Sequence, residues 1–183
     1  MSTYAEANVL QRALRRCGAS GPGSWLLAPV LYRLDREVYG ATRGRHTLSS
    51  LLSGLPIVLL TTTGARSGRP ATVALTGLPT PDGLGLIASN YGRAEHPAWY
   101  HNLRAEPAAE IAVDGARTRV RAVEVEGEQR ARIWEQALKS YPGYSNYERR
   151  AGDRRIAVFV LEPLTSRTPA AGAAGGAPAR PYP

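Results

Sequence analysis

Cysteine and histidine are scarce in this sequence, and their scarcity excludes several kinds of site. Cys17 is the single cysteine in 183 residues, so neither an internal disulfide nor a cysteine metal site can form. The three histidines, His46, His96 and His101, lack the spacing of metal ligands and have no acidic cluster beside them. We therefore expect no metal site, and a fold that depends on side-chain packing.

Long apolar runs are also missing. No stretch approaches the roughly 20 uninterrupted apolar residues of a membrane span, and the N-terminus lacks the basic and apolar blocks of a signal peptide. Patterns that place a serine or cysteine nucleophile beside a histidine are absent too. The sequence therefore predicts a soluble, cytoplasmic protein whose chemistry, if it has any, is supplied by a cofactor.

The positive charge comes almost entirely from arginine, since Lys139 is the only lysine. The net charge of +8 is compatible with nucleic acid, an acidic membrane surface or an anionic small molecule as the partner. The arginines are dispersed, however, and no motif that reads nucleic acid is present. We therefore expect no nucleic-acid partner.

The length and the 43% hydrophobic content suffice for one folded domain, which we place at residues 51–164. Residues 165–183 are a Pro/Ala/Gly tail that buries too little apolar surface to offset the entropy of ordering, so disorder is expected. Residues 1–50 form a helical extension, with amphipathic spacing over 4–17 and 25–39. These helices pack on the domain or, as the alternative, attach it to a membrane surface or a partner.

Runs rich in β-branched residues, separated by turn residues, predict about six strands, at 57–63, 71–78, 84–89, 109–115, 118–126 and 155–163. Residues 156–161 are apolar on both faces, as in a strand enclosed between a barrel interior and covering helices. Helical spacing predicts a helix over 96–106, with Pro97 at its first position, and another over 127–141. The predicted fold class is mainly β with helices (α+β): a small barrel with a pair of helices of the C-terminal half packed on it.

Three segments contain residue types that suit a planar, anionic ligand. In LLTTTGARSGRP (59–70), hydroxyl groups, two glycines and the guanidinium groups of Arg66 and Arg69 suit a phosphate, and a simple turn is the alternative. In 88–103, a strand end leads through a glycine-containing loop into a helix N-terminus, which also favours an anion. In YPGYSNYERR (141–150), tyrosines recur every third residue and either cover a flat aromatic ligand or pack on the protein.

In this order, the three segments resemble the deazaflavin (F420)-dependent nitroreductase and quinone reductase family over residues 55–163. The resemblance implies a split β-barrel of the flavin-binding type, with coenzyme F420 as the cofactor. It also implies an oxidoreductase that transfers a hydride from the reduced deazaflavin to a planar, electron-poor small molecule, such as a quinone, an enone or a nitroaromatic. Barrels of this type often dimerise, so a homodimer is expected, although no residue marks its interface.

The same resemblance implies roles for individual residues. Tyr144 would act as the catalytic residue that faces the substrate above the ring, and Tyr141 and Tyr147 would complete the cover. The cofactor-binding residues would be Ala65, Arg66 and Ser67 in the first loop, Ala71, Thr72, Val73 and Ala74 on the next strand, Ile87, Ala88, Ser89 and Asn90 at the second strand end, and Ala98, Trp99, Tyr100, His101 and Asn102 at the helix start.

Two positions depart from the family pattern. Family members commonly carry a lysine where this chain has Asn90, and a basic residue where it has Ala71. Each lost charge-assisted contact corresponds to roughly 1.5 to 3 kcal/mol, which is about tenfold or more in affinity. The departures motivate two alternatives, a cofactor-independent cyclase or isomerase of a natural product and a non-catalytic protein that binds a flavin or another flat ligand.

Overall fold

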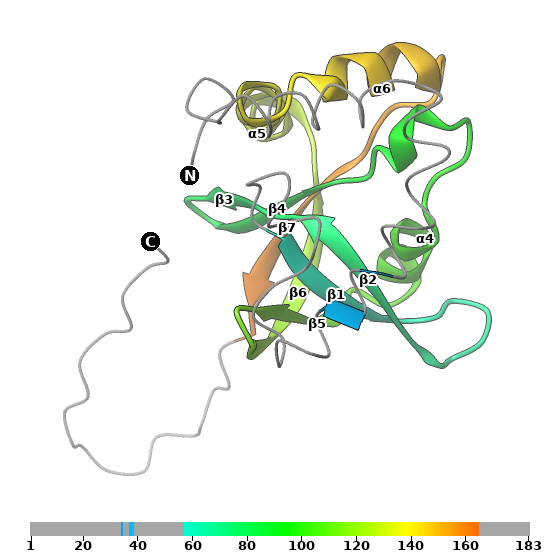
Figure 1. Cartoon of the computed structure of the whole chain (residues 1–183), viewed down its shortest axis with the longest axis vertical. Helices are drawn as coiled ribbons and strands as arrows, with labels where there is room; N and C mark the ends of the chain where they lie inside the picture. Colours follow the sequence, from blue (N-terminus) through cyan, green and yellow to red (C-terminus); the bar gives the residue numbers. More distant parts are fainter. Residues whose placement is uncertain (1–33, 35–36, 39–56, 165–183) are drawn as a thin grey trace, which may run out of the picture.

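The computed structural model describes residues 34, 37, 38 and 57–164 (Figure 1). Its elements between residues 57 and 164 are β1 (Ile57–Thr63), β2 (Pro70–Thr76), β3 (Leu78–Thr80), β4 (Gly83–Ile87), the 3-10 helix η1 (Asn90–Gly92), α4 (Ala98–Ala105), β5 (Ala108–Val113), β6 (Ala116–Val125), α5 (Gly127–Ser140), α6 (Gly143–Ala151) and β7 (Val158–Pro163). The predicted helix over 4–17 and the tail 165–183 lie outside the described residues. The predicted helix over 25–39 does so except at residues 34, 37 and 38, which are helical.

All seven strands belong to one antiparallel sheet, in the order β2-β1-β5-β6-β7-β4-β3. β2 and β3 therefore lie at opposite edges, although only Gly77 separates them in the sequence. Neighbouring segments can lie at opposite edges only if the sheet curls until its edges approach each other, and β2 does contact β4. The curled sheet is visible in Figure 1. It confirms the predicted split-barrel α+β fold.

The sheet has seven strands instead of the predicted six or so, because the expected strand over 71–78 is divided at Gly77. β3 pairs with β4, with Leu78 opposite Gly85, instead of continuing along β1. A Cβ atom on Gly77 would lie only 3.0 Å from a Leu84 methyl carbon, so glycine lets the chain cross close to β4. A second correction concerns Pro97, which is the N-cap of α4 and not its first helical residue.

Two buried clusters hold the helices to the sheet. The first, which includes Leu60, Trp99 and Phe159, packs α4 against one face of the sheet. The second, which includes Ile133 and Val158, lies under α5 and α6. Each fully buried side chain of this size contributes about 1.5–3 kcal/mol relative to an exposed one. The predicted helix pair on the sheet is confirmed.

Residues 156–161 are all buried, as predicted for a strand covered on both faces. No helix among the described residues combines the length and the apolar character needed to cross a bilayer. The predicted membrane or partner contact through residues 1–50 falls outside the described residues, except at 34, 37 and 38.

Candidate functional site

The β1–β2 loop is attached to the middle of α4 by Asn102. The amide of Ala65 donates a hydrogen bond to Asn102 Oδ1 at 2.9 Å, and Asn102 Nδ2 donates to Thr62 Oγ1 at 2.9 Å. Asn102 is 8% exposed, so both bonds are sheltered from water. Two of the three predicted segments are therefore joined directly.

The loop itself is one tight turn. Gly68 N donates to the Gly64 carbonyl at 2.8 Å, and Gly64 N donates to the Arg69 carbonyl at 2.9 Å. Gly68 has a φ of 65°, a left-handed conformation that glycine adopts without steric cost. Within 57–164, the amides of Arg66 and Ser67 make no hydrogen bond. Successive amides at such a turn can converge on an anion.

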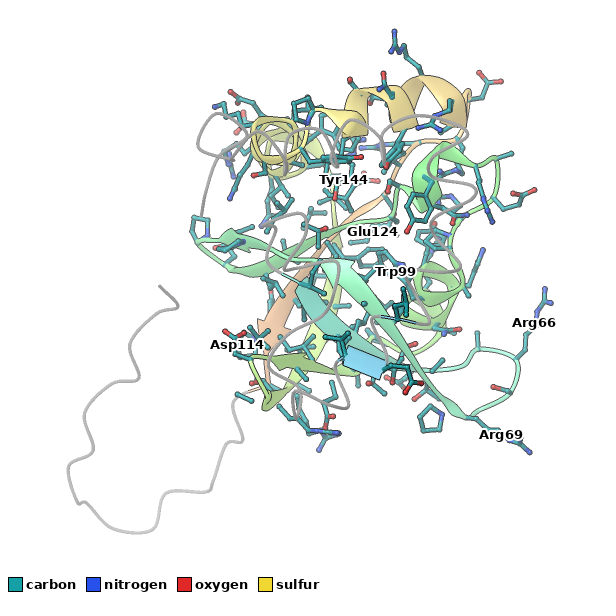
Figure 2. All side chains as sticks on the ribbon, viewed as in Figure 1. Arg66, Arg69, Trp99, Asp114, Glu124 and Tyr144 are labelled. Atoms are coloured by element: carbon teal, nitrogen blue, oxygen red, sulfur yellow. The ribbon has the colours of Figure 1, made fainter. Side chains whose placement is uncertain are left out.

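Two guanidinium groups extend from this turn. Figure 2 shows Arg66 on the outer part of the loop and Arg69 beside the start of β2, both pointing away from the sheet and from Tyr144. Both residues are exposed, and residues 64–69 contain no acidic side chain. The loop therefore offers two amides and two cations, which suit the charge and the oxygen atoms of a phosphate.

Small side chains line the edge strand that follows the loop. In β2, Ala71 and Thr72 are exposed, and Val73 and Ala74 are half-buried. The Thr72 hydroxyl lies 2.9 Å from the Thr61 hydroxyl on β1. Next to the loop, this edge therefore carries short side chains only.

The second predicted segment is held in place by Arg154, a residue that sequence analysis did not single out. Its guanidinium group donates to the carbonyl oxygens of Ala88 at 3.1 Å, Ser89 at 2.7 Å and Arg93 at 2.9 Å. Asn90 contributes a further restraint, because its Nδ2 donates to the Glu95 carbonyl at 2.8 Å. The path of the backbone after β4 is therefore fixed from both sides.

Several predicted cofactor contacts on this segment and on α4 are buried. Ile87, Ala88, Trp99 and Tyr100 are each at most 7% exposed, whereas Ser89 and Asn90 are half-buried and Ala98 and His101 are exposed. The ring centroids of Trp99 and Phe159 are 5.9 Å apart, so Trp99 belongs to the core. Trp99 could therefore contact a ligand only with its backbone or with the small part of its ring that is exposed.

Tyr100 faces a different part of the molecule. Its ring stacks on His96 with centroids 3.9 Å apart, beside a cavity of about 260 Å³. Arg130, Arg154, Arg155, Glu124 and Glu126 also line that cavity, which contains no residue of the β1–β2 loop. Burial, and then the neighbouring Arg154, lower the pKa of His96. The mixed charge makes this cavity a poor match for the predicted anion site.

The third predicted segment forms a compact cluster of tyrosines around the start of α6. The rings of Tyr141, Tyr144 and Tyr147 lie 5.4 to 5.9 Å apart, and the hydroxyl groups of Tyr141 and Tyr147 are 3.0 Å apart. Tyr144 is 6% exposed, and its side chain lies close to Thr76 of β2. The structure therefore brings the three predicted tyrosines together, close to the end of β2.

Burial keeps these phenols protonated far into the alkaline range. It raises the pKa of Tyr141 to about 12, an effect partly offset by the hydrogen bond with Tyr147. Burial and the nearby phenols also raise the pKa of Tyr144 and of Tyr147. At neutral pH each hydroxyl can therefore donate a hydrogen bond but carries no charge.

α6 also contacts the second segment. A Cβ atom on Gly92 would lie 2.6 Å from the Tyr147 carbonyl oxygen, so η1 and α6 are in close contact. Tyr91 packs edge to face on Tyr147, with centroids 5.9 Å apart. Sequence analysis missed Tyr91, because it lies 50 positions before the tyrosine repeat.

Among the described residues, no group of three His, Cys, Asp or Glu side chains could hold a metal ion.

Comparisons with known proteins agree on one family. A family model described as F420H(2)-dependent quinone reductase matches residues 31–163. The F420H(2)-dependent quinone reductase Rv1261c of Mycobacterium tuberculosis (strain ATCC 25618 / H37Rv) is 37% identical over 135 residues, which are 72% of this chain and 89% of that protein.

Two solved structures are similar to this fold. One, described as an F420-H2 dependent reductase (FDR-A), has a TM-score of 0.54 and 38% identity, over 58% of this chain and 94% of its own. The other, described as a domain-swapped dimer, has a TM-score of 0.57 and 33% identity, over 78% of this chain and 100% of its own.

Proposed function

The chain belongs to the F420H(2)-dependent quinone reductase family, and from this membership we propose that it reduces planar quinones at the site formed by the β1–β2 loop, β2 and the tyrosine cluster. It is an F420H2-dependent oxidoreductase, with coenzyme F420 as its cofactor and a small molecule as its substrate. The matched relatives do not favour a cofactor-independent cyclase. The acceptor and the residue roles are the proposal.

The β1–β2 loop would hold the phosphate of the coenzyme. The amides of Arg66 and Ser67 make no hydrogen bond within 57–164, and the guanidinium groups of Arg66 and Arg69 are exposed, so all four can turn to one anion. Asn102 holds Ala65 and so sets the position of the turn relative to α4. This donor set, on a loop without carboxylates, is the observation that supports the proposed cofactor site.

The flat part of the coenzyme would lie along β2. Ala71 and Ala74 are small, and Thr72 is exposed, so a planar ring can approach this edge without displacing a large side chain. When bound, the reduced deazaflavin supplies the hydride. The role of the protein is then to hold the acceptor at a near-attack distance and to exclude water from one face of it.

The tyrosine cluster would contact the acceptor. Tyr141 is the most accessible of the three predicted tyrosines, since it is half-buried while Tyr144 and Tyr147 are buried. Its pKa of about 12 makes its hydroxyl a stable hydrogen-bond donor to a quinone oxygen but a poor proton source at neutral pH. We therefore propose that Tyr141 orients the quinone and that Tyr144 and Tyr147 support Tyr141 by packing. Water then donates the proton to the quinone.

Two measurements test the proposal. Titration of the purified protein with F420H2, followed by the fluorescence of the coenzyme, should show saturable binding in the micromolar range. Mixing the complex with 1,4-naphthoquinone should then oxidise F420H2 with the protein present and much more slowly without it. Absence of binding at tens of micromolar would contradict the proposed site.

A homodimer is the favoured assembly, because a similar structure is described as a domain-swapped dimer. Light scattering coupled to size exclusion should give a mass near 39 kDa, about twice the 19.6 kDa of one chain. A single peak at the monomer mass would contradict this.

A further inference from the structure

Tyr91 adopts a backbone conformation that tyrosine rarely takes. Its φ is 57° and its ψ is 19°, in the left-handed region, and it lies between Asn90 with a φ of 47° and Gly92 with a φ of 76°. Asparagine and glycine tolerate this region, whereas a bulky side chain is strained there. A glycine at position 91 would suit the backbone better than the residue that is present.

The surrounding structure maintains this strain. Arg154 holds the carbonyl groups of Ala88, Ser89 and Arg93, and Asn90 holds the Glu95 carbonyl. Gly92 is in close contact with Tyr147. The segment is therefore restrained before, within and after η1, and the direction of the Tyr91 side chain is set by the fold.

The side chain of Tyr91 is also unusually exposed. It is 44% exposed, and the only other large hydrophobic residues exposed within the described part of the chain are Leu34 and Leu164. Its ring meets that of Tyr147 at 77°, so it extends the tyrosine cluster outward from buried Tyr147. Backbone strain and an exposed aromatic ring both cost stability, and such costs are typically found at functional sites.

We infer that Tyr91 is a specificity-determining residue, whose ring forms the outer wall of the acceptor site and favours extended planar acceptors over single-ring ones. This inference rests on the proposed quinone reduction beside the tyrosine cluster. The rings of Tyr91 and Tyr141 each lie 5.9 Å from that of Tyr147. An aromatic wall selects by contact area, because a two-ring acceptor beside Tyr141 covers more of the Tyr91 ring than a one-ring acceptor does. The hydroxyl of Tyr91 is not required for this selection.

The test compares Tyr91→Gly and Tyr91→Phe with the unmodified protein, using 1,4-naphthoquinone and the single-ring tetramethyl-1,4-benzoquinone as acceptors. Tyr91→Gly should lower kcat/KM for the naphthoquinone about fivefold, change it for the benzoquinone less than twofold, and leave F420H2 binding unchanged. Its urea midpoint should change little, because glycine relieves the backbone strain but loses the contact with Tyr147. Tyr91→Phe should keep the preference of the unmodified protein.

Other outcomes separate the two proposals. An unchanged acceptor ratio in Tyr91→Gly would overturn the inference, and so would equal losses for both acceptors together with a lower urea midpoint, which would mark a structural role. If the unmodified protein oxidises F420H2 with neither quinone, quinone reduction itself fails. In that case equilibrium dialysis of naphthoquinone decides about Tyr91: weaker binding by Tyr91→Gly supports the wall, and equal binding excludes it.

Discussion

The carboxamide oxygen of Asn102 accepts a hydrogen bond from the backbone amide of Ala65 at 2.9 Å. This bond joins the β1–β2 loop to α4, although the two residues are 37 positions apart in the chain. The same side chain donates to Thr62 in the strand that precedes the loop. Strand, loop and helix thus share one buried amide group. The proposed phosphate site depends on this bridge, since both neighbouring amides belong to the turn that it holds.

Asn102→Ala should therefore affect stability and cofactor binding together. Loss of both bonds leaves buried polar groups without partners, which costs about 1–3 kcal/mol in the free energy of unfolding. The Kd of F420H2 should rise about tenfold, because the turn is no longer held. Thr62→Val is the matched control: it removes the bond to Thr62 and keeps the one to Ala65, so it should lower stability with a smaller change in Kd. Equal changes in Kd would contradict the bridge. Urea unfolding and fluorescence titration measure both quantities.

Arg66→Ala and Arg69→Ala should weaken F420H2 binding about tenfold each, if each guanidinium group makes a charge-assisted contact to phosphate. Both side chains are exposed, so the free energy of unfolding should change by less than about 0.5 kcal/mol. Arg132→Ala is the control, because Arg132 is an exposed arginine on α5 that pairs with Glu128 at 3.6 Å. Titration at two salt concentrations should show a shallower salt dependence only for the loop variants. If the Kd and its salt dependence changed no more in the loop variants than in Arg132→Ala, the loop would not be part of the cofactor site.

Ala71→Arg should strengthen F420H2 binding, whereas Asn90→Lys should not. Ala71 is exposed on the edge strand directly after the loop, so an added guanidinium group can reach the same phosphate and lower the Kd about tenfold. Asn90 has a φ of 47° and bonds the Glu95 carbonyl, so a lysine there adds strain and loses that bond. Fluorescence titration and thermal unfolding of both variants check this contrast. A larger gain from Asn90→Lys would contradict it.

Arg154→Ala should lower the free energy of unfolding by about 2–3 kcal/mol, because three backbone carbonyl groups lose a charged donor. Amide hydrogen exchange should speed up at residues 88–93, which those bonds restrain. Arg155→Ala, at the next position, should cost at most about 1 kcal/mol, since Arg155 makes an exposed ion pair with Glu126 at 3.4 Å. Similar losses for the two variants would argue against the restraint.

The buried tyrosines should make the protein sensitive to alkali. A tyrosine whose pKa is higher in the folded state than its ordinary value of 10.0 favours the folded state at low pH, and this contribution is lost as the pH rises from about 10. The contribution of these tyrosines to the free energy of unfolding should therefore be constant up to about pH 9. It should then fall as the pH rises toward the Tyr141 pKa of about 12. Urea unfolding between pH 8 and 11 should show a shallower fall for Tyr141→Phe. Identical slopes would contradict the raised pKa.

Local features could be predicted from the sequence because each depends on a few neighbouring residues. Alternating and continuous apolar runs predicted the strands, and the spacing of Ile133, Trp134 and Ala137 predicted α5. The composition of the β1–β2 loop indicated an anion site, and the repeat of tyrosines indicated a cluster. The order of these segments along the chain was sufficient to identify the family.

The division of the predicted strand over 71–78 at Gly77 could not be predicted from such local patterns. Residues 71–78 read as one strand because their apolar pattern continues, whereas the structure ends β2 and begins β3 within it. The break arises from the curl of the whole sheet, which takes the chain from one edge to the other. Curl depends on the pairing of all seven strands. Gly77 permits the crossing, but a single glycine does not show that the chain moves to the other edge.

By itself, the sequence determined the approximate positions of most strands and of α4 and α5, which loop suits a phosphate and which tyrosines recur at helical spacing, since backbone geometry and side-chain chemistry act over short distances. Only the tertiary structure decided which residues meet: Asn102 with Ala65, Arg154 with a carbonyl group 66 positions away, and Tyr91 with Tyr147. In a chain rich in arginine, no local signal separates Arg154 from its neighbours. Its partners are chosen by the packing of the curled sheet against the helices, which is a property of the whole domain.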